Sequence, residues 1–211
     1  MAKKSLKRGI FVTFEGIEGC GKSTQSKLLY ANLRAAGYAC IYTREPGGTP
    51  LGEKIRELIL HSDGINISDL SELFLFEGAR AQIVKEVIAP ALKAKKIVIC
   101  DRFSDATFSY QGYGGKVPIE IIKILDHVAT AGLKPDLTIL LDLDTPTGLA
   151  RAGRKGAADR MERKDIAYHN RVRAGYLDLA RRYHKRIKVI RASGTIETTR
   201  RAVAAEAERV V

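Results

Sequence analysis

The sequence predicts a single three-layer α/β domain, residues 1–211, built on a parallel sheet of five strands. Apolar runs of strand length recur at wide intervals, and segments with the apolar spacing of helices separate them. Three of these runs are apolar at nearly every position, as expected of strands that are covered on both faces. Such alternation along the whole chain is typical of a parallel sheet with helices on either side.

Five runs are predicted to be strands, and the first, third and fourth are the nearly continuous apolar ones. They are residues 10–14 (IFVTF), 40–43 (CIYT), 97–100 (IVIC), 137–141 (LTILL) and 187–190 (IKVI). In a sheet of this kind ligands bind beyond the carboxyl ends of the strands. The residues that follow each run are therefore the first candidates for a site.

Helices are predicted between and after these strands from their apolar spacing. They cover residues 26–36 with Gly37 as the stop, 51–59, a stretch from Asp69, 121–128, 172–183 and a last stretch from Thr195. Asp69 followed by Glu72 resembles a capping box. Thr195 is the expected N-cap of the last helix.

Composition places the chain among ordinary globular proteins, with 45% hydrophobic and 28% charged residues. No apolar run approaches the roughly 18 residues that span a bilayer. The stretch after the basic start MAKKSLKRG is too short for a signal peptide, so we expect a cytoplasmic protein without a membrane partner. Three cysteines without a CxxC pair argue against a disulfide framework and a zinc site.

The formal net charge of +12 is compatible with two kinds of partner. A basic protein suits nucleic acid, but it also suits small polyanionic substrates, whose local concentration its field raises. Aromatic RNA-binding motifs, zinc fingers and basic low-complexity tails are absent from the sequence. Charge alone does not separate these interpretations.

The segment GIEGCGKST directly follows the first predicted strand and precedes a predicted helix, which is the context of a phosphate-binding loop. It consists of Gly16, Ile17, Glu18, Gly19, Cys20, Gly21, Lys22, Ser23 and Thr24. Its glycines let backbone N–H groups converge on phosphate oxygens, Lys22 can reach the β and γ phosphates, and the Ser23 hydroxyl can bind Mg²⁺. The loop predicts binding of a nucleoside triphosphate with magnesium. Glu18 does not suit an anion cradle and needs a separate explanation.

Charged residues also follow the second and third predicted strands. Asp101 can hold a magnesium-bound water beside the loop, and Arg102 can bind a second anion. Arg44 comes before the turn Glu-Pro-Gly-Gly, whose X-Pro bond can be cis, and Arg56 lies one helical stretch later. We expect these cations to face one cleft.

A basic, glycine-containing segment follows the fourth predicted strand, at about residues 151–161. It is poor in apolar residues, so we expect it to pack weakly and to form a mobile lid. Arg151, Arg154 and Arg160 are its arginines. Phosphoryl transfer is helped chiefly by positioning and by cations on the equatorial oxygens, which such a lid can deliver.

In this order the motifs resemble those of the bacterial thymidylate kinases, over residues 9–194. Residues 14–25 resemble the family's phosphate loop, 43–49 (TREPGGT) its second loop, 75–80 (LFEGAR) its nucleobase-facing helix, and 101–103 with 109–112 (SYQG) its monophosphate segment. The resemblance implies a P-loop kinase fold with a mobile lid. It also implies transfer of the γ-phosphoryl of ATP to dTMP, with Mg²⁺, to give dTDP and ADP for dTTP synthesis.

The resemblance assigns roles to residues that face the acceptor nucleotide. Phe76 would stack on thymine, Arg80 would donate to its O4, and Thr107 and Gln111 would bind polar base edges or nearby groups. The acceptor phosphate would be held by Arg44, Arg56 and Arg102, with Glu45 organising the loop. The stretch of residues 192–194 would border adenine. Lys22, Arg102 and the lid arginines Arg151, Arg154 and Arg160 would be the catalytic cations.

The same resemblance offers an explanation for Glu18. Family members carry an acid at this position that faces the acceptor and hydrogen-bonds the sugar 3′-hydroxyl, which favours a deoxyribose. Members with an Arg at the position of Gly19 lack catalytic arginines in the lid. Here Gly19 is not Arg and the lid holds three arginines, as in the bacterial subtype. The family is usually homodimeric, and neither nucleic acid nor a membrane is an expected partner.

Three departures from the family pattern concern base selectivity: Gly78 where Ala is usual, Phe108 in place of a polar residue, and Ala106 where some members have Ser. The main alternative is a P-loop kinase for another deoxynucleotide or a deoxynucleoside. A nucleic-acid-stimulated ATPase is supported only by the charge. A GTPase switch is disfavoured because the sequence has no Asn-Lys-x-Asp motif.

Overall fold

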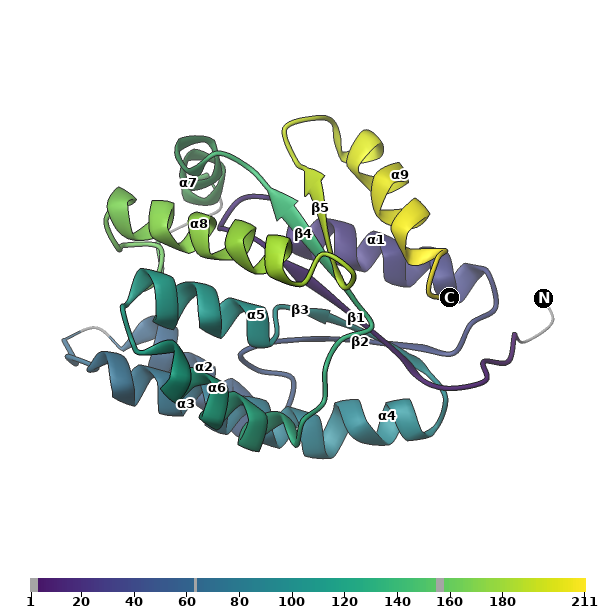
Figure 1. Ribbon diagram of the computed structural model, residues 1–211, viewed down its shortest axis with the longest axis horizontal. Helices are drawn as coiled ribbons and strands as arrows, with labels where there is room; N and C mark the ends of the chain where they lie inside the picture. The colour runs from purple at the N-terminus through teal and green to yellow at the C-terminus, as the bar shows by residue number, and fades with distance from the viewer. Residues whose placement is uncertain (1–3, 63, 155–157) are drawn as a thin grey trace.

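A five-stranded parallel sheet lies at the centre of the computed structural model, which describes residues 4–62, 64–154 and 158–211 (Figure 1). The strands are β1 (Ile10–Glu15), β2 (Cys40–Arg44), β3 (Ile97–Asp101), β4 (Leu137–Asp142) and β5 (Ile187–Arg191), in the spatial order β2-β3-β1-β4-β5. Because β1 pairs with both β3 and β4, the segments that leave these three strands emerge side by side.

All five predicted strands are confirmed, and each extends one residue further than its apolar run. The additional residues are Glu15, Arg44, Asp101, Asp142 and Arg191. The backbone ladder continues through them because its hydrogen bonds do not depend on the side chain. The register pairs Phe14 with Asp101 and Arg44 with Asp101, so the polar strand ends meet at one edge of the sheet.

The helical segments lie on both faces of this sheet. They are α1 (Lys22–Ala35), α2 (Pro50–His61), α3 (Asp69–Ile83), the π-helical turn η1 (Val84–Ile88), α4 (Ala89–Lys93), α5 (Ser104–Thr107), the π-helical turn η2 (Phe108–Gly114), α6 (Ile119–Thr130), α7 (Thr145–Gly153), α8 (Ile166–Arg182) and α9 (Ile196–Ala207). α1 and α9 pack together over one face, whereas α4 and α8 contact strands of the sheet and η2 packs on α8 (Figure 1). α2, α3 and α6 lie next to one another beyond the sheet.

Of the two N-caps expected from the sequence, one is confirmed and the other is wrong. Thr195 is the N-cap of α9, accepting from the Thr198 N–H at 3.1 Å, as predicted. The prediction for Asp69 is wrong by one residue, because Ser68 caps α3 and accepts from the Ser71 N–H at 3.2 Å. Glu72, expected in the capping box, is instead buried and points into the protein.

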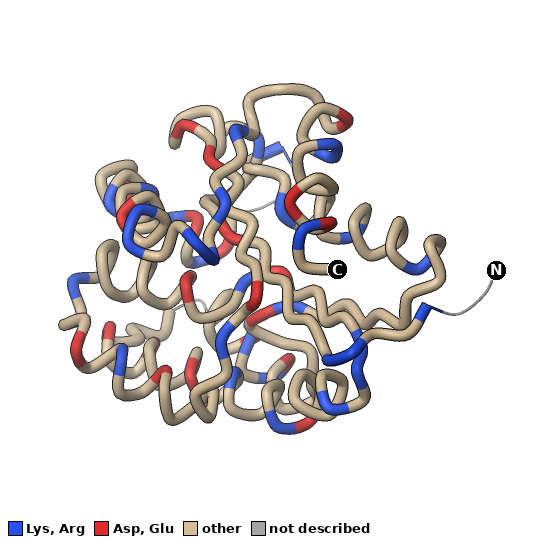
Figure 2. The backbone as a smooth tube through the Cα atoms, turned by 45° about the vertical axis from the view of Figure 1, so that its right-hand side comes forward, with Lys and Arg blue, Asp and Glu red and all other residues tan. Residues whose placement is uncertain are grey.

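The charge distribution bears on the choice of partner. Figure 2 shows Lys and Arg spread over several elements, with Asp and Glu between them, rather than gathered in one basic stripe. Among the described residues no helix is both long and apolar enough to cross a bilayer. Cys20 and Cys100 are buried and Cys40 is partly buried, and all three are free thiols.

Candidate active site

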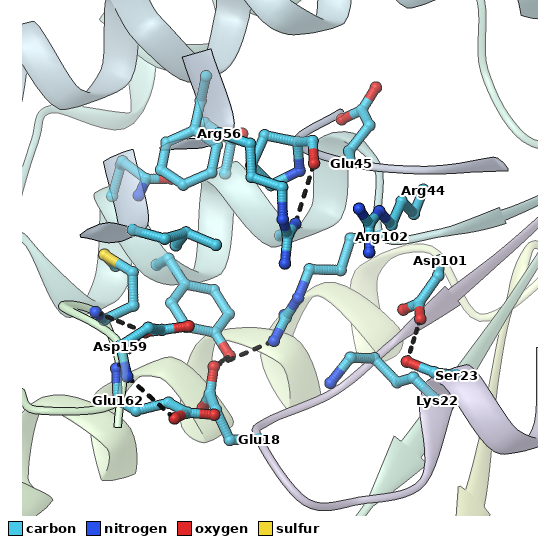
Figure 3. Close-up of a pocket in the computed structure, with 18 of the residues that line it drawn as sticks. Glu18, Lys22, Ser23, Arg44, Glu45, Arg56, Asp101, Arg102, Asp159 and Glu162 are labelled. Carbon is cyan, nitrogen blue, oxygen red and sulfur yellow. Dashed lines mark hydrogen bonds and ion pairs between the residues drawn. The ribbon is translucent and has the colours of Figure 1, made fainter. Parts of the chain in front are cut away.

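A polar cavity opens at the carboxyl ends of β1, β2 and β3 (Figure 3). Its lining includes Glu18, Gly19, Lys22, Ser23, Arg44, Glu45, Pro46, Arg56, Leu60, Phe76, Arg80, Asp101, Arg102, Ala106, Thr107, Tyr110, Gln111, Asp159, Met161 and Glu162. Every residue predicted for the acceptor nucleotide is in this set. Both residues predicted for the metal are there as well.

The segment between β1 and α1 forms the loop that its sequence predicts. Gly16, Gly19 and Gly21 have φ values of 135°, 67° and 98°, which residues with a Cβ rarely adopt. α1 begins at Lys22 without a side-chain cap, so its first N–H groups are available to an anion. The Lys22 ammonium donates to the carbonyls of Gly16 at 2.9 Å and Ile17 at 2.8 Å, which holds it at the loop.

Ser23 and Asp101 meet at the edge of the cavity. The Ser23 hydroxyl donates to Asp101 Oδ2 at 2.5 Å (Figure 3). They come together because Ser23 is in the first turn of α1 and Asp101 ends β3, the strand next to β1. An alcohol and a carboxylate oxygen are the hard ligands that Mg²⁺ prefers, and Mg²⁺ needs few protein ligands because it retains several waters.

Glu18 projects from the loop into the cavity and is matched by a cation. Arg102 Nη2 donates to Glu18 Oε1 at 3.0 Å, and the Tyr110 hydroxyl donates to the same oxygen at 2.5 Å. Burial alone would raise the pKa of Glu18, but His169, Arg102 and Lys22 together hold this pKa well below its usual range. The carboxylate is therefore ionised inside an anion-binding cleft.

Arg102 is aimed at the cavity by its backbone. Its φ of 73° lies in the left-handed region, which is uncommon for a residue other than glycine. The Arg102 N–H donates to the Phe14 carbonyl at 3.0 Å, and the Cys100 thiol donates to the Arg102 carbonyl at 3.0 Å. This conformation ends β3 and turns the guanidinium toward Glu18. Strained backbone of this kind is frequent at functional sites.

Glu15, the last residue of β1, binds two groups that hold Arg102 in place. Its carboxyl group accepts from the Phe103 N–H at 2.7 Å and from the Tyr176 hydroxyl at 2.9 Å. Tyr176 in turn accepts from Arg102 Nη1 at 3.3 Å. Burial raises the pKa of Glu15 to about 8, and the nearby charge of Asp105 adds to the shift.

The cavity lining also contains the aromatic residue expected for a base. Phe76 on α3 is partly buried and lines the cavity with Gln111. The Gln111 amide donates to Glu72 Oε1 at 2.8 Å, so its orientation is fixed by a residue outside the lining. Ala106 also lines the cavity, whereas Gly78 and Phe108, the other departures from the family pattern, are not in the lining.

Arg80 is buried among carboxylates. Its guanidinium pairs with Glu45 at 2.7 Å, Glu77 at 2.6 Å and Asp126 at 3.6 Å, and it donates to the Thr107 hydroxyl at 2.8 Å. Burial raises the pKa of Glu45 to about 7, although Arg80 opposes the shift. Arg80 and Thr107 reach the cavity, but the guanidinium already binds several protein acceptors. Donation from Arg80 to a base stays a prediction.

The two other cationic side chains of the lining, Arg44 and Arg56, each contact a neighbouring group. Arg44 is exposed and pairs with Glu53 at 3.1 Å, and Arg56 Nη1 donates to the Pro46 carbonyl at 3.0 Å. The Glu45–Pro46 peptide bond is cis, the form that the turn sequence allows. With Lys22, Arg80 and Arg102, the lining therefore carries five cationic side chains.

The lid arginines are not in the lining of this cavity. Arg151 lies on α7 and donates to the Ala192 carbonyl at 3.2 Å. Arg154 follows α7 as an exposed C-cap residue. Arg160 is turned toward α2 and α3, where it donates to the Ile59 carbonyl at 2.7 Å and pairs with Glu72. Residues 155–157 of the predicted lid lie outside the described residues.

Two features of this segment were not expected from its composition. α7 continues to Gly153, and the segment after the undescribed residues is docked, since the Arg160 N–H donates to the Leu60 carbonyl at 3.1 Å. Arg160 thus satisfies carbonyls at the end of α2, groups that a helix terminus leaves without partners. The expectation of weak packing does not hold for this part.

Sequence reasoning also missed several residues that support the site. Tyr110, His169 and Tyr176 contact Glu18 or Arg102, and Asp159 and Glu162 line the cavity. The spacing places Tyr176 on the buried face of a helix, which is correct, but it does not reveal what its hydroxyl binds. Of these residues, only Tyr110 lies in a motif, Ser-Tyr-Gln-Gly, that could have indicated its part in the site.

Comparison with known proteins gives a consistent result. The family model described as thymidylate kinase matches residues 14–203. The thymidylate kinase of Desulfosudis oleivorans is 47% identical over 208 residues, covering 95% of this chain and 97% of the relative. That of Deinococcus radiodurans is 46% identical over 188 residues, covering 89% and 91%. The crystal structure of thymidylate kinase from Ehrlichia chaffeensis superposes with a TM-score of 0.78 at 35% identity, covering 95% of this chain and 99% of that one.

The raised pKa of Glu15 predicts a pH-dependent cost to stability. Its ordinary value of 4.5 applies to the unfolded chain, and its folded value is about 8. Between these values the folded protein holds a proton that the unfolded chain has lost, so the free energy of unfolding falls as pH rises, by up to about 1.4 kcal/mol per pH unit. We expect Glu15→Gln to make this decline shallower, with Glu45, whose pKa is also raised, to about 7, accounting for part of what remains, as measured by urea unfolding from pH 5 to pH 9.

The exposed Glu57 offers a matched control. Glu57→Gln should give a stability curve parallel to that of the unchanged protein. A parallel curve for Glu15→Gln would contradict the assignment of a proton to Glu15.

Proposed function

The chain belongs to the thymidylate kinase family and is a dTMP kinase, and we propose that it transfers the γ-phosphoryl of ATP to dTMP within the cavity described above. One observation carries the assignment of roles: the phosphate loop with Lys22, the ion pair of Glu18 with Arg102, and the aromatic side chain of Phe76 all line the same cavity. ATP would bind the loop. The acceptor would extend from Arg102 toward Phe76, and the product dTDP would serve dTTP synthesis.

The order of these residues fits a nucleoside monophosphate in one orientation. Arg102, Arg44 and Arg56 would hold its phosphate near the loop. Glu18 and Tyr110, which are hydrogen-bonded to each other in the lining, would face the sugar. Phe76 and Gln111 would contact the base. Glu45, paired with Arg80, would keep the second loop in place.

The transfer would need no strong base, because the acceptor phosphate is already an anionic nucleophile at neutral pH. Lys22 would neutralise charge on the transferred group, and Arg102 would orient the attacking phosphate oxygen. As the new P–O bond forms, the bond to the β,γ-bridging oxygen breaks, and ADP leaves with that oxygen. The segment predicted as the lid, residues 151–161, is docked at its Arg160 end, and with ATP bound it would exclude water and prevent hydrolysis of ATP.

The oxygen ligands Ser23 and Asp101 support the proposal that ATP binds with Mg²⁺. They lie next to Lys22, and the loop would bring phosphate oxygens beside them. When bound, Mg²⁺ would neutralise charge on the phosphates. A cytoplasmic location also belongs to the proposal, as the place where ATP and deoxynucleotides are available.

A homodimer is the oligomeric state that we propose, and an apolar helix face supports it. This face consists of Leu51 and Leu58 on α2, Leu70 and Phe74 on α3, and Ile121, Ile124 and Val128 on α6, all of them exposed. The three helices are neighbours, and exposed apolar side chains that gather on adjacent helices are typical of interaction sites. Gly78 lies one turn from Phe74, and a Cβ added there would meet nothing within 4 Å, so a partner helix could approach closely.

Coupled ADP-release assays test the function directly. With ATP and Mg²⁺ we expect dTMP to be preferred over dUMP and dCMP, and thymidine to be inactive, because Arg102 and its neighbours bind a phosphate. Arg102→Ala should lower kcat/KM for dTMP by roughly 100-fold or more, since it removes the cation that holds the acceptor phosphate and orients its attacking oxygen. A preference for thymidine, or ATP hydrolysis stimulated by DNA without transfer, would overturn the assignment.

The lid arginines are predicted to differ from one another. Arg151 is beside the phosphate loop, since a Cβ added at Gly19 would lie 3.0 Å from its Cβ. We expect Arg151→Ala to lower kcat by on the order of 10³-fold with little change in stability.

Arg160→Ala should instead lower the free energy of unfolding by about 3 kcal/mol, because Glu72 is left buried without its cation. Kinetics and urea unfolding of both variants, with Arg154→Ala alongside, decide this, and equal stability losses would contradict it.

The apolar helix face predicts the oligomeric state. We expect sedimentation velocity at micromolar concentration to show a dimer. The double substitution Ile124→Lys with Val128→Lys should convert it to a monomer, because it places charges in a desolvated interface. Ile196→Lys, at an exposed apolar residue that begins α9, is the matched control and should leave the dimer intact. A monomeric unchanged protein would refute the proposal.

A further inference from the structure

Glu18 is contacted on two sides by different groups. Its Oε1 faces the cavity, where Arg102 and Tyr110 donate to it. Its Oε2 is turned away into the protein, where Nδ1 of His169 lies at 3.3 Å. Arg102 and Tyr110 line the cavity, whereas His169 is outside its lining and is fully buried on α8. The carboxylate thus has a front oxygen and a rear oxygen with separate partners.

The rear contact is incomplete. Among the described residues neither ring nitrogen of His169 has a well-aligned hydrogen-bond partner, and the same holds for Glu18 Oε2. Buried polar atoms without partners cost free energy, and they are uncommon in native proteins. Two of them, His169 Nδ1 and Glu18 Oε2, face each other at one contact, which needs an explanation beyond packing. Hydrogen bonds in active sites are often long and tighten only when the substrate is bound.

We propose that His169 is a positioning residue for the acceptor nucleotide, which acts through Glu18. It donates from Nδ1 to the rear oxygen and fixes the carboxylate plane, so that the front oxygen meets the sugar 3′-hydroxyl of the acceptor. The inference rests on the proposed function, in which Glu18 faces that sugar. It adds that recognition of the 3′-hydroxyl depends on a residue that touches no substrate.

A matched pair of substitutions isolates the donor of His169. Asparagine places an amide nitrogen at the position of Nδ1. Leucine is close to asparagine in size and is likewise branched at Cγ, but it has no donor. His169→Asn and His169→Leu therefore lose similar packing, and only the first keeps the hydrogen bond. The measured quantity is the ratio of kcat/KM for dTMP to kcat/KM for 3′-deoxythymidine monophosphate. A change in packing alone would affect both acceptors equally and leave this ratio unchanged.

We expect the ratio to fall about tenfold in His169→Leu and to stay near that of the unchanged protein in His169→Asn, since hydrogen bonds to charged groups are among the stronger ones. Equal ratios in the two variants would overturn the proposal, and so would an unchanged ratio in His169→Leu. If the unchanged protein fails to phosphorylate dTMP, it is the proposed function that fails. An active protein with equal ratios refutes the role of His169 alone.

A second measurement does not depend on the folding of the variants. The chain has four histidines, so the ring ¹⁵N signals of the unchanged protein can be assigned one by one. Adding dTMP should shift the His169 ring signals as the contact to Glu18 tightens, and 3′-deoxythymidine monophosphate should shift them much less. Identical shifts with both nucleotides, or none with either, would contradict the proposal.

Discussion

The ion pair between Glu18 and Arg102 is the interaction on which the rest of the site depends. A carboxylate beside a phosphate loop would repel its ligand unless a cation lay against it. Arg102 supplies that cation from the end of β3, and only a left-handed backbone at this residue turns it toward the loop. The pairing of β1 with β3 sets the two residues side by side. The sheet register, the left-handed backbone of Arg102 and the balance of charge therefore all act on the ion pair between Glu18 and Arg102.

Much of the architecture could be predicted from the sequence, because apolar runs and helical spacing are local properties. The five strands begin where their apolar runs begin. Their last residues were missed, because Glu15, Arg44 and Asp101 are polar and end the apolar pattern while the ladder continues. Of these three, Arg44 and Asp101 line the cavity, and Glu15 binds the Phe103 N–H next to Arg102. A pattern based on burial therefore fails at the edge where ligands bind.

The candidate site could be predicted as far as short motifs reach. Lys22, Ser23 and Arg102 stand in such motifs, and all three line the cavity. The residues that brace them could not be predicted, because their partners are far away in the chain. Tyr176 fits an apolar helical face, yet its hydroxyl binds Glu15, 161 residues earlier. Arg160 stands among basic residues, and only the fold shows that it caps α2 instead of facing the cavity.

Gly19 and Gly148 touch across the gap between the phosphate loop and α7. A Cβ on Gly19 would lie 2.0 Å from the Gly148 carbonyl oxygen, and one on Gly148 would lie 2.6 Å from the Glu18 carbonyl oxygen. No side chain of any kind fits at the loop position while α7 stays where it is. An arginine at the position of Gly19 and α7 in its present place therefore cannot occur together. A substitution of Gly19 alone would therefore have to displace α7, the helix that carries Arg151.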